Sequence, residues 1–116
     1  MVRTRRPGAA YGCALDAALG VVGARGKVLV LWALDECPRD PAGLRRALPD
    51  VADDVLAAHL RELEEDGVVR RDATGGGETR YALTPAGAAL SEALVPLGAW
   101  GREHVVGLSA YPPPTA

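Results

Sequence analysis

The stretch from residue 51 to residue 83 constrains the fold more than any other part of the chain. Val55, Leu56, Leu60 and Leu63 recur at the spacing of a single apolar stripe along a helix, and Gly67 marks the end of that helix. Two short runs of strand-forming residues follow, VVRRD and TRYAL, and the glycine-rich segment ATGGGE lies between them. The pattern therefore predicts an amphipathic helix that leads directly into a two-stranded hairpin.

Two helices are predicted before this unit. The run KVLVLWALDE is apolar without a break from Val28 to Leu34, and we interpret it as a buried helix. The turn CPRDP follows, and AGLRRAL then forms a short helix that Pro49 stops. Asp50 is expected to cap the next helix, with Asp53 and Asp54 in the first turn, where the helix dipole favours carboxylates.

A last helix is predicted to open at Thr84 and Pro85, because proline is tolerated in the first turn of a helix. Its apolar stripe consists of Leu90, Leu94, Leu97 and Trp100. Pro96 interrupts this pattern, and we expect it to kink or break the helix.

The two ends of the chain are almost uncharged. Residues 7–24 contain one charged residue, Asp16, and residues 83–101 contain one, Glu92. A helix with almost no polar face has to be buried, and so small a domain cannot cover two such segments by itself. The pattern favours a homodimer joined through both ends. The alternative is that these segments lack charge only because they are rich in Ala and Gly, without forming an interface. The predicted interface residues are Tyr11, Leu15, Leu19, Leu90, Leu94, Leu97 and Trp100.

The composition is typical of one small domain. With 116 residues and 4% aromatics, none of them Phe, the core has to be assembled mainly from Leu, Val and Ala. We expect one domain over residues 11–106, with a flexible basic arm at 1–10 and a Pro-rich tail at 107–116. Two cysteines, no run of 18 apolar residues and no leader-like segment predict a protein of the reducing cytoplasm, without membrane contact.

Together these elements predict a mainly α-helical fold with a small β-hairpin (α+β), in the order of a winged helix-turn-helix. Its three-helix core carries the wing, and helices at the N- and C-terminal ends serve dimerisation. The residues also resemble those of the HxlR family of bacterial transcription regulators, over roughly residues 12–105. The stretches that carry the resemblance are LRRALPDV, VLAAHLRELEEDGVVRR, RYALTPAGAAL and AWGREH. LTPAG alone occurs in many winged helices, whereas its combination with LRRALP and WGREH is more specific.

The resemblance implies a homodimer that binds a palindromic operator in double-stranded DNA. The helix from about Ala52 to Asp66 is then the recognition helix in the major groove, and residues 73–78 are the wing tip against the backbone. The residues expected to contact DNA are Arg45, Arg46, Asp54, Ala57, Ala58, Arg61, Arg70, Arg71 and Arg80.

The start of this helix departs from the family pattern. Relatives usually have Ser or Thr followed by a basic residue where this chain has Ala52, Asp53 and Asp54. A carboxylate accepts a hydrogen bond from cytosine N4, so Asp54 stays a candidate for base readout. Adjacent carboxylates nevertheless repel phosphates, and residues 38–82 hold seven Arg against ten Asp and Glu. The competing hypothesis is a repurposed winged-helix module that binds a ligand or a protein, with lost or weakened DNA binding.

The arginines of the short helix and of the hairpin also have an interpretation without DNA. In it, Arg45 and Arg46 form a helix surface near Asp50, and the hairpin arginines form a solvated strand face with Asp72 and Glu78. The sequence alone leaves both interpretations open.

No enzymatic site is predicted. His59 and His104 have no partner at the spacing of metal ligands, and Ser91 and Ser109 lie far from either histidine in the sequence. The segment TGGGET lacks the lysine that a phosphate-binding loop requires. We therefore expect no catalytic residue, no metal and no cofactor.

Cys13 is a candidate for sensing oxidants or electrophiles. Many relatives keep a cysteine near the start of the first helix, although the proline that usually follows it is Ala14 here. The amino end of a helix favours a reactive thiolate; the alternative is a buried small hydrophobic residue. Small residues in the apolar ends also motivate the hypothesis of a small-molecule effector at the dimer interface.

Overall fold

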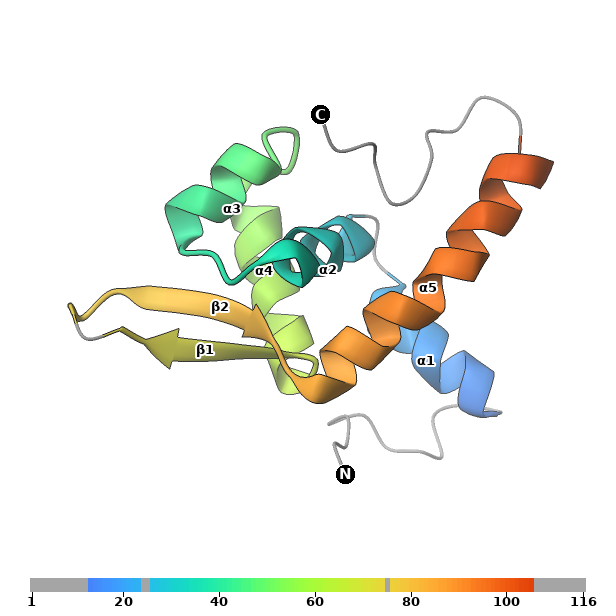
Figure 1. Ribbon diagram of the computed structural model, residues 1–116, viewed down its shortest axis with the longest axis horizontal. Coiled ribbons are helices and arrows are strands. Elements are labelled where there is room, and N and C mark those ends of the chain that lie inside the picture. The colour runs from blue at the N-terminus through green and yellow to red at the C-terminus, as the bar shows by residue number, and fades with distance from the viewer. Residues whose placement is uncertain (1–12, 24–25, 75, 106–116) are drawn as a thin grey trace.

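The computed structural model of the protein describes residues 13–23, 26–74 and 76–105 (Figure 1). The elements within them are α1 (Ala14–Val22), α2 (Lys27–Glu36), α3 (Pro41–Ala47), α4 (Asp53–Glu65), β1 (Val69–Ala73), β2 (Thr79–Leu83) and α5 (Pro85–His104). The two strands form an antiparallel hairpin in which Val69 pairs with Leu83. The prediction of a mainly α-helical fold with one small hairpin, in this order, is confirmed.

The core is built around α2. Val30, Leu31 and Ala33 of this helix are completely buried, as its unbroken apolar run predicts. Leu60 and Leu63 of α4 are buried in the same cluster, which also holds residues of α3, β1 and α5. The hairpin and α5 extend from this core in different directions (Figure 1).

Side-chain caps begin two of the helices. At α3 the side chain of Asp40 accepts a hydrogen bond from the Gly43 N–H at 2.7 Å, so Pro41 opens this helix instead of preceding it. At α5 the hydroxyl of Thr84 accepts from the Gly87 N–H at 3.1 Å and donates to the Gly67 carbonyl at 2.7 Å. The second hydrogen bond fixes the start of α5 against the end of α4.

The predicted cap of α4 is wrong. Its N-cap residue is Ala52, without a side-chain hydrogen bond, whereas Asp50 lies in the turn before it. This turn is closed by the hydrogen bond from the Val51 N–H to the Leu48 carbonyl, so the chain reaches helical geometry only later. Asp53 and Asp54 do lie in the first turn, as expected.

α5 is one helix of 20 residues that continues through Pro96. The expectation that this proline interrupts the helix is therefore wrong. A proline removes the hydrogen bond to the carbonyl four residues earlier, here that of Glu92. Both residues are exposed, so water is available to the carbonyl in place of the missing N–H.

The junction at Gly26 leads from an exposed helix into the core. Of α1 only Val21 is buried, and Gly26, the N-cap of α2, has a φ of 93°, which favours glycine.

Among the described residues, no single helix is long and apolar enough to span a membrane. In the described part of the chain, the bent pair of α1 and α2 alone meets that length and composition.

Candidate nucleic-acid interface

The outer face of α4 is open to solvent. α4 buries Leu56, Leu60 and Leu63 toward the core and leaves Asp54, Ala57 and Arg61 exposed. Val55, predicted to belong to the same apolar stripe, is 41% exposed. Asp54 and Arg61 are seven residues apart, which is almost two helical turns, so they share one face. Of the other predicted contact residues on α4, Ala58 is half-buried.

The predicted arginines surround this face, and all six are exposed. Three of them form ion pairs: Arg45 Nε lies 3.4 Å from Asp53 Oδ1, Arg71 Nε 3.4 Å from Glu64 Oε1, and Arg70 Nε 2.9 Å from Asp72 Oδ2. Arg46, Arg61 and Arg80 form no ion pair within the described residues.

These ion pairs modify two expectations from the sequence, on the acidic start of α4 and on the partners of the hairpin arginines. Arg45 contacts Asp53 of the neighbouring helix, so one of the two adjacent carboxylates at the start of α4 is already partly neutralised. Arg70 pairs with Asp72, as the interpretation without DNA expected, whereas Arg71 pairs with Glu64 of α4. Exposed pairs of this kind contribute only about 0–1 kcal/mol each, so they do not hold the arginines away from other anions.

The hairpin presents its arginines on two different faces. Arg71 pairs across the strands with Tyr81, while Arg70 pairs with Ala82 and Arg80 with Asp72. Because successive side chains of a strand point to opposite faces, Arg71 and Tyr81 lie on one face and Arg70 and Arg80 on the other. Arg70 also donates to the Leu83 carbonyl at 3.2 Å. The three predicted arginines therefore do not form one contiguous patch.

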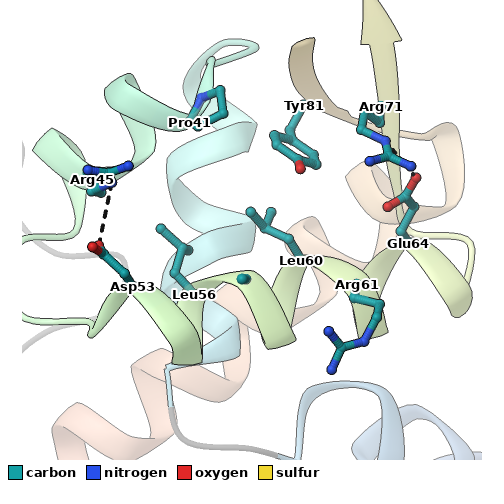
Figure 2. A pocket seen from close by; sticks show the side chains of 10 residues that line it. Pro41, Arg45, Asp53, Leu56, Leu60, Arg61, Glu64, Arg71 and Tyr81 are labelled. Carbon is teal, nitrogen blue, oxygen red and sulfur yellow. Dashed lines mark ion pairs between the residues drawn. The ribbon is translucent and has the colours of Figure 1, made fainter.

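A pocket of about 380 Å³ lies between α3, α4 and the hairpin (Figure 2). It is lined by Pro41, Arg45, Asp53, Leu56, Ala57, Leu60, Arg61, Glu64, Arg71 and Tyr81. The two ion pairs Arg45–Asp53 and Arg71–Glu64 lie at its opposite ends, with Tyr81 between them (Figure 2). The lining combines two arginine–carboxylate pairs with apolar side chains and Tyr81, groups that suit the binding of a charged partner.

The sequence pattern does not predict this pocket, because a backbone bridge between distant segments forms one side of it. The Arg39 N–H donates to the Tyr81 carbonyl at 3.0 Å, and the Tyr81 N–H donates to the Arg39 carbonyl at 2.8 Å. This isolated bridge brings the segment before α3 beside β2, and with it Pro41 beside Tyr81. Such a contact has no signal in a local pattern.

A buried cation behind α4 was also not predicted. Lys27 has 2% of its side chain exposed, and its Nζ lies 2.7 Å from Oε1 of Glu62, which is 40% exposed. A signal was present, because a lysine in the first turn of a helix lies at the wrong end of the helix dipole. The pair joins the start of α2 to the inner side of the helix that carries the candidate interface.

The residues predicted for the dimer interface divide into three groups. Leu15, Leu19, Leu97 and Trp100 are exposed, the last two by 53% and 57%. Leu90 is half-buried, and Leu94 is a member of the core cluster with 8% exposure, so it adds nothing to the open apolar face. Tyr11 lies outside the described residues.

Cys13 is the N-cap residue of α1 and is exposed. The alternative that it is a buried small hydrophobic residue is therefore wrong for the single subunit. Its sensing role stays a prediction, as does the effector. No group of three His, Cys, Asp or Glu side chains that could hold a metal ion occurs in the part of the chain that the structure describes.

Comparison with known proteins gives concordant results. The model of the HxlR-like helix-turn-helix family matches residues 21–107. YtcD of Bacillus subtilis, an uncharacterized HTH-type transcriptional regulator, is 32% identical over 97 residues, which cover 82% of this chain and 77% of YtcD. A crystal structure of YtcD matches with a TM-score of 0.72, over 80% of this chain and 97% of that one.

Two further proteins are similar. YtfH of Escherichia coli, also an uncharacterized HTH-type transcriptional regulator, is 37% identical over 81 residues, which cover 68% of this chain and 64% of YtfH. The crystal structure of quinone-bound YodB from B. subtilis matches with 26% identity and a TM-score of 0.68, over 77% of this chain and 96% of that one.

Proposed function

The chain belongs to the HxlR-like helix-turn-helix family and is a transcriptional regulator of the winged-helix type; from that premise we propose that it is a homodimer that binds palindromic operators in double-stranded DNA. α4 enters the major groove, and the hairpin lies against the backbone. The observation that carries the proposal is the exposed outer face of α4, with arginines of α3 and of the hairpin on both sides of it. The family consists of regulators and not enzymes, which agrees with the expectation from sequence.

The acidic start of α4 is compatible with this function. Asp53 stands in an ion pair with Arg45, so approaching phosphates meet a pair and not an isolated carboxylate. Both pairs are formed by the Nε of the arginine, so the Nη groups of Arg45 and Arg71 can bind phosphate oxygens while the pairs persist. Arg46 is exposed and forms no ion pair among the described residues, so it is a further candidate for a phosphate contact.

The most direct test is a mobility-shift assay with DNA from upstream of the protein's own gene, at two salt concentrations. We expect affinity to fall as salt rises, because bound phosphates release counterions. Arg71→Ala should weaken binding and reduce the salt slope by about 0.9, since Arg71 lies on the hairpin face toward α4. Arg70→Ala is the matched control, because it removes an adjacent arginine of the opposite face.

Two results would contradict the proposal. Equal losses in the two variants would mean that the hairpin does not present its α4 side to DNA. No binding of any promoter by an intact dimer would favour the alternative of a repurposed module that binds a ligand or a protein.

The dimer is proposed to form through α1 and α5. Leu15 and Leu19 of α1 and Val95, Leu97 and Trp100 of α5 are apolar side chains left open by the subunit. So many exposed apolar groups on two helices are unusual for a monomer and typical of an interface. A two-fold axis through this face sets the two α4 helices at a fixed separation, as a palindromic site requires.

Leu97→Asp should shift the dimer toward monomers. Leu97 is about half exposed, so burying the remainder contributes about 1 kcal/mol per copy and about 2 kcal/mol per dimer, a factor of roughly thirty in the dissociation constant. Sedimentation equilibrium measures the shift. Val55→Asp is the control, because Val55 is an exposed apolar residue outside the proposed interface. An unchanged dimer in Leu97→Asp would exclude α5 from the interface.

A further inference from the structure

We propose that α4 selects a particular order of bases in each operator half-site: a cytosine at Asp54, a guanine at Arg61, and a thymine methyl at Ala57 between them. This inference rests on the proposed DNA binding and adds which base pairs are preferred. It follows from which polar groups of α4 are already engaged within the subunit and which are left to face a groove.

The carboxylates on either side of this face are engaged. Asp53 pairs with Arg45 of α3, and Glu64 pairs with Arg71 of β1, at the two ends of the pocket (Figure 2). Both are thus tied to the elements that flank α4. Glu65 is exposed, but it is the last residue of α4 and lies one turn beyond Arg61, farther from the N-terminal residues with which a recognition helix contacts base edges.

Asp54 and Arg61 remain as the polar groups in the middle of the outer face. One oxygen of Asp54, Oδ1, accepts from the Val55 N–H at 3.0 Å, which orients the exposed carboxylate and leaves Oδ2 for another donor. Arg61 forms no ion pair among the described residues. Its side chain points away from Tyr81 (Figure 2). The residues between them on this face are Ala57 and the half-buried Ala58, so no bulky side chain separates the helix from the bases.

The spacing of the two residues sets the spacing of the bases. A helix rises about 1.5 Å per residue, so seven residues separate Asp54 and Arg61 by about 10.5 Å along its axis. Successive base pairs are about 3.4 Å apart, so this distance corresponds to about three base-pair steps. Ala57 lies three residues after Asp54 and faces the bases between these two positions.

The chemistry of each side chain then selects its base. An ionised carboxylate only accepts hydrogen bonds, so Asp54 is repelled by the N7 and O6 acceptors of guanine and by the O4 acceptor of thymine. Adenine offers its N6 donor next to its own N7 acceptor, whereas the cytosine base itself presents only the N4 donor in the major groove. Cytosine is therefore the favoured partner of Asp54. The fork of Arg61 matches O6 and N7 of guanine, and the methyl group of Ala57 suits the methyl group of thymine.

Selection of binding sites from a random DNA library tests the inference. The wild-type chain should enrich inverted half-sites with a cytosine and a guanine about three steps apart. Asp54→Asn should change the cytosine to adenine and leave the other positions as they are, because an amide pairs with N6 and N7 of adenine. Arg61→Ala should lose the preference for guanine and weaken binding of the wild-type site by roughly 10- to 100-fold.

Arg71→Ala, on the hairpin face toward α4, is the control for a backbone contact that carries no sequence information. It should weaken all sequences equally, reduce the salt slope by about one and leave the enriched sequence unchanged. An enriched sequence without this pair of bases, or one that Asp54→Asn does not alter, would overturn the inference while DNA binding itself stands. If the wild-type chain enriches no sequence, the proposed operator binding fails as well. Circular dichroism of each variant verifies that the exposed substitutions leave the fold intact.

Discussion

Gly87→Ala is expected to lower the free energy of unfolding by at least about 3 kcal/mol. Gly87 lies in the first turn of α5, and a Cβ at this position would overlap the carbonyl oxygen of Val68 and lie 2.9 Å from its carbonyl carbon. Overpacking against side chains costs about 1–3 kcal/mol, and a backbone group gives way less easily than a side chain. The Thr84 N–H also donates to this same carbonyl at 3.1 Å, which holds it in place.

A thermal melt measures the effect as a fall in Tm of roughly 10 °C or more. Gly76→Ala is the matched control, because the nearest atom to a Cβ there is Thr74 Oγ1 at 4.0 Å and the position lies outside the proposed dimer face. It should be neutral or raise stability by about 0.4–1 kcal/mol through the unfolded state. Similar melts for the two variants would show that α5 does not approach Val68 this closely.

The parts of the fold that follow from sequence are those specified by local chemistry. The unbroken apolar run of α2 has no polar face, so burial was its only stable outcome. The glycine-rich loop between two strand-forming runs fixed the hairpin, and Thr84 followed by Pro85 fixed the start of α5. In each case the decisive groups lie within a few residues of one another.

The errors arose where distant segments decide the outcome. Asp50 has the right side chain for a cap, but the turn closed by Leu48 and Val51 delays the start of α4. Pro96 was expected to interrupt α5, yet its position on an exposed surface lets the helix continue. The pairing of Arg45 with Asp53 depends on how α3 packs beside α4, which no local pattern specifies.

The sequence alone could have predicted that the two adjacent arginines of the hairpin lie on opposite faces. Arg70 and Arg71 are adjacent in a predicted strand, so alternation alone places their side chains on opposite faces. The structure adds that Arg71 is the arginine directed toward α4, because it contacts Glu64 of that helix. Phosphate-binding arginines in a hairpin are therefore better predicted at every second residue than as a run.

Glu62→Ala is expected to be the second most damaging substitution, with a loss of about 2–3 kcal/mol in the free energy of unfolding. It leaves the Lys27 ammonium group, which is almost completely buried, without the carboxylate 2.7 Å from its Nζ. Removing one partner of a buried pair usually costs about 3–5 kcal/mol. The lower value is expected here because Glu62 is 40% exposed and water partly screens the pair.

Lys27→Met distinguishes the effect of the Lys27 charge on stability from the effect of its side-chain packing. Methionine fills a similar volume without a charge, so this variant should stay within about 1 kcal/mol of the wild type. The double variant Lys27→Met, Glu62→Ala should be more stable than Glu62→Ala alone, because no buried cation is left unpaired. Urea unfolding of the four proteins measures this coupling. If adding Lys27→Met to Glu62→Ala restores no stability, the cost of Glu62→Ala comes from other contacts of Glu62 and not from the unpaired Lys27.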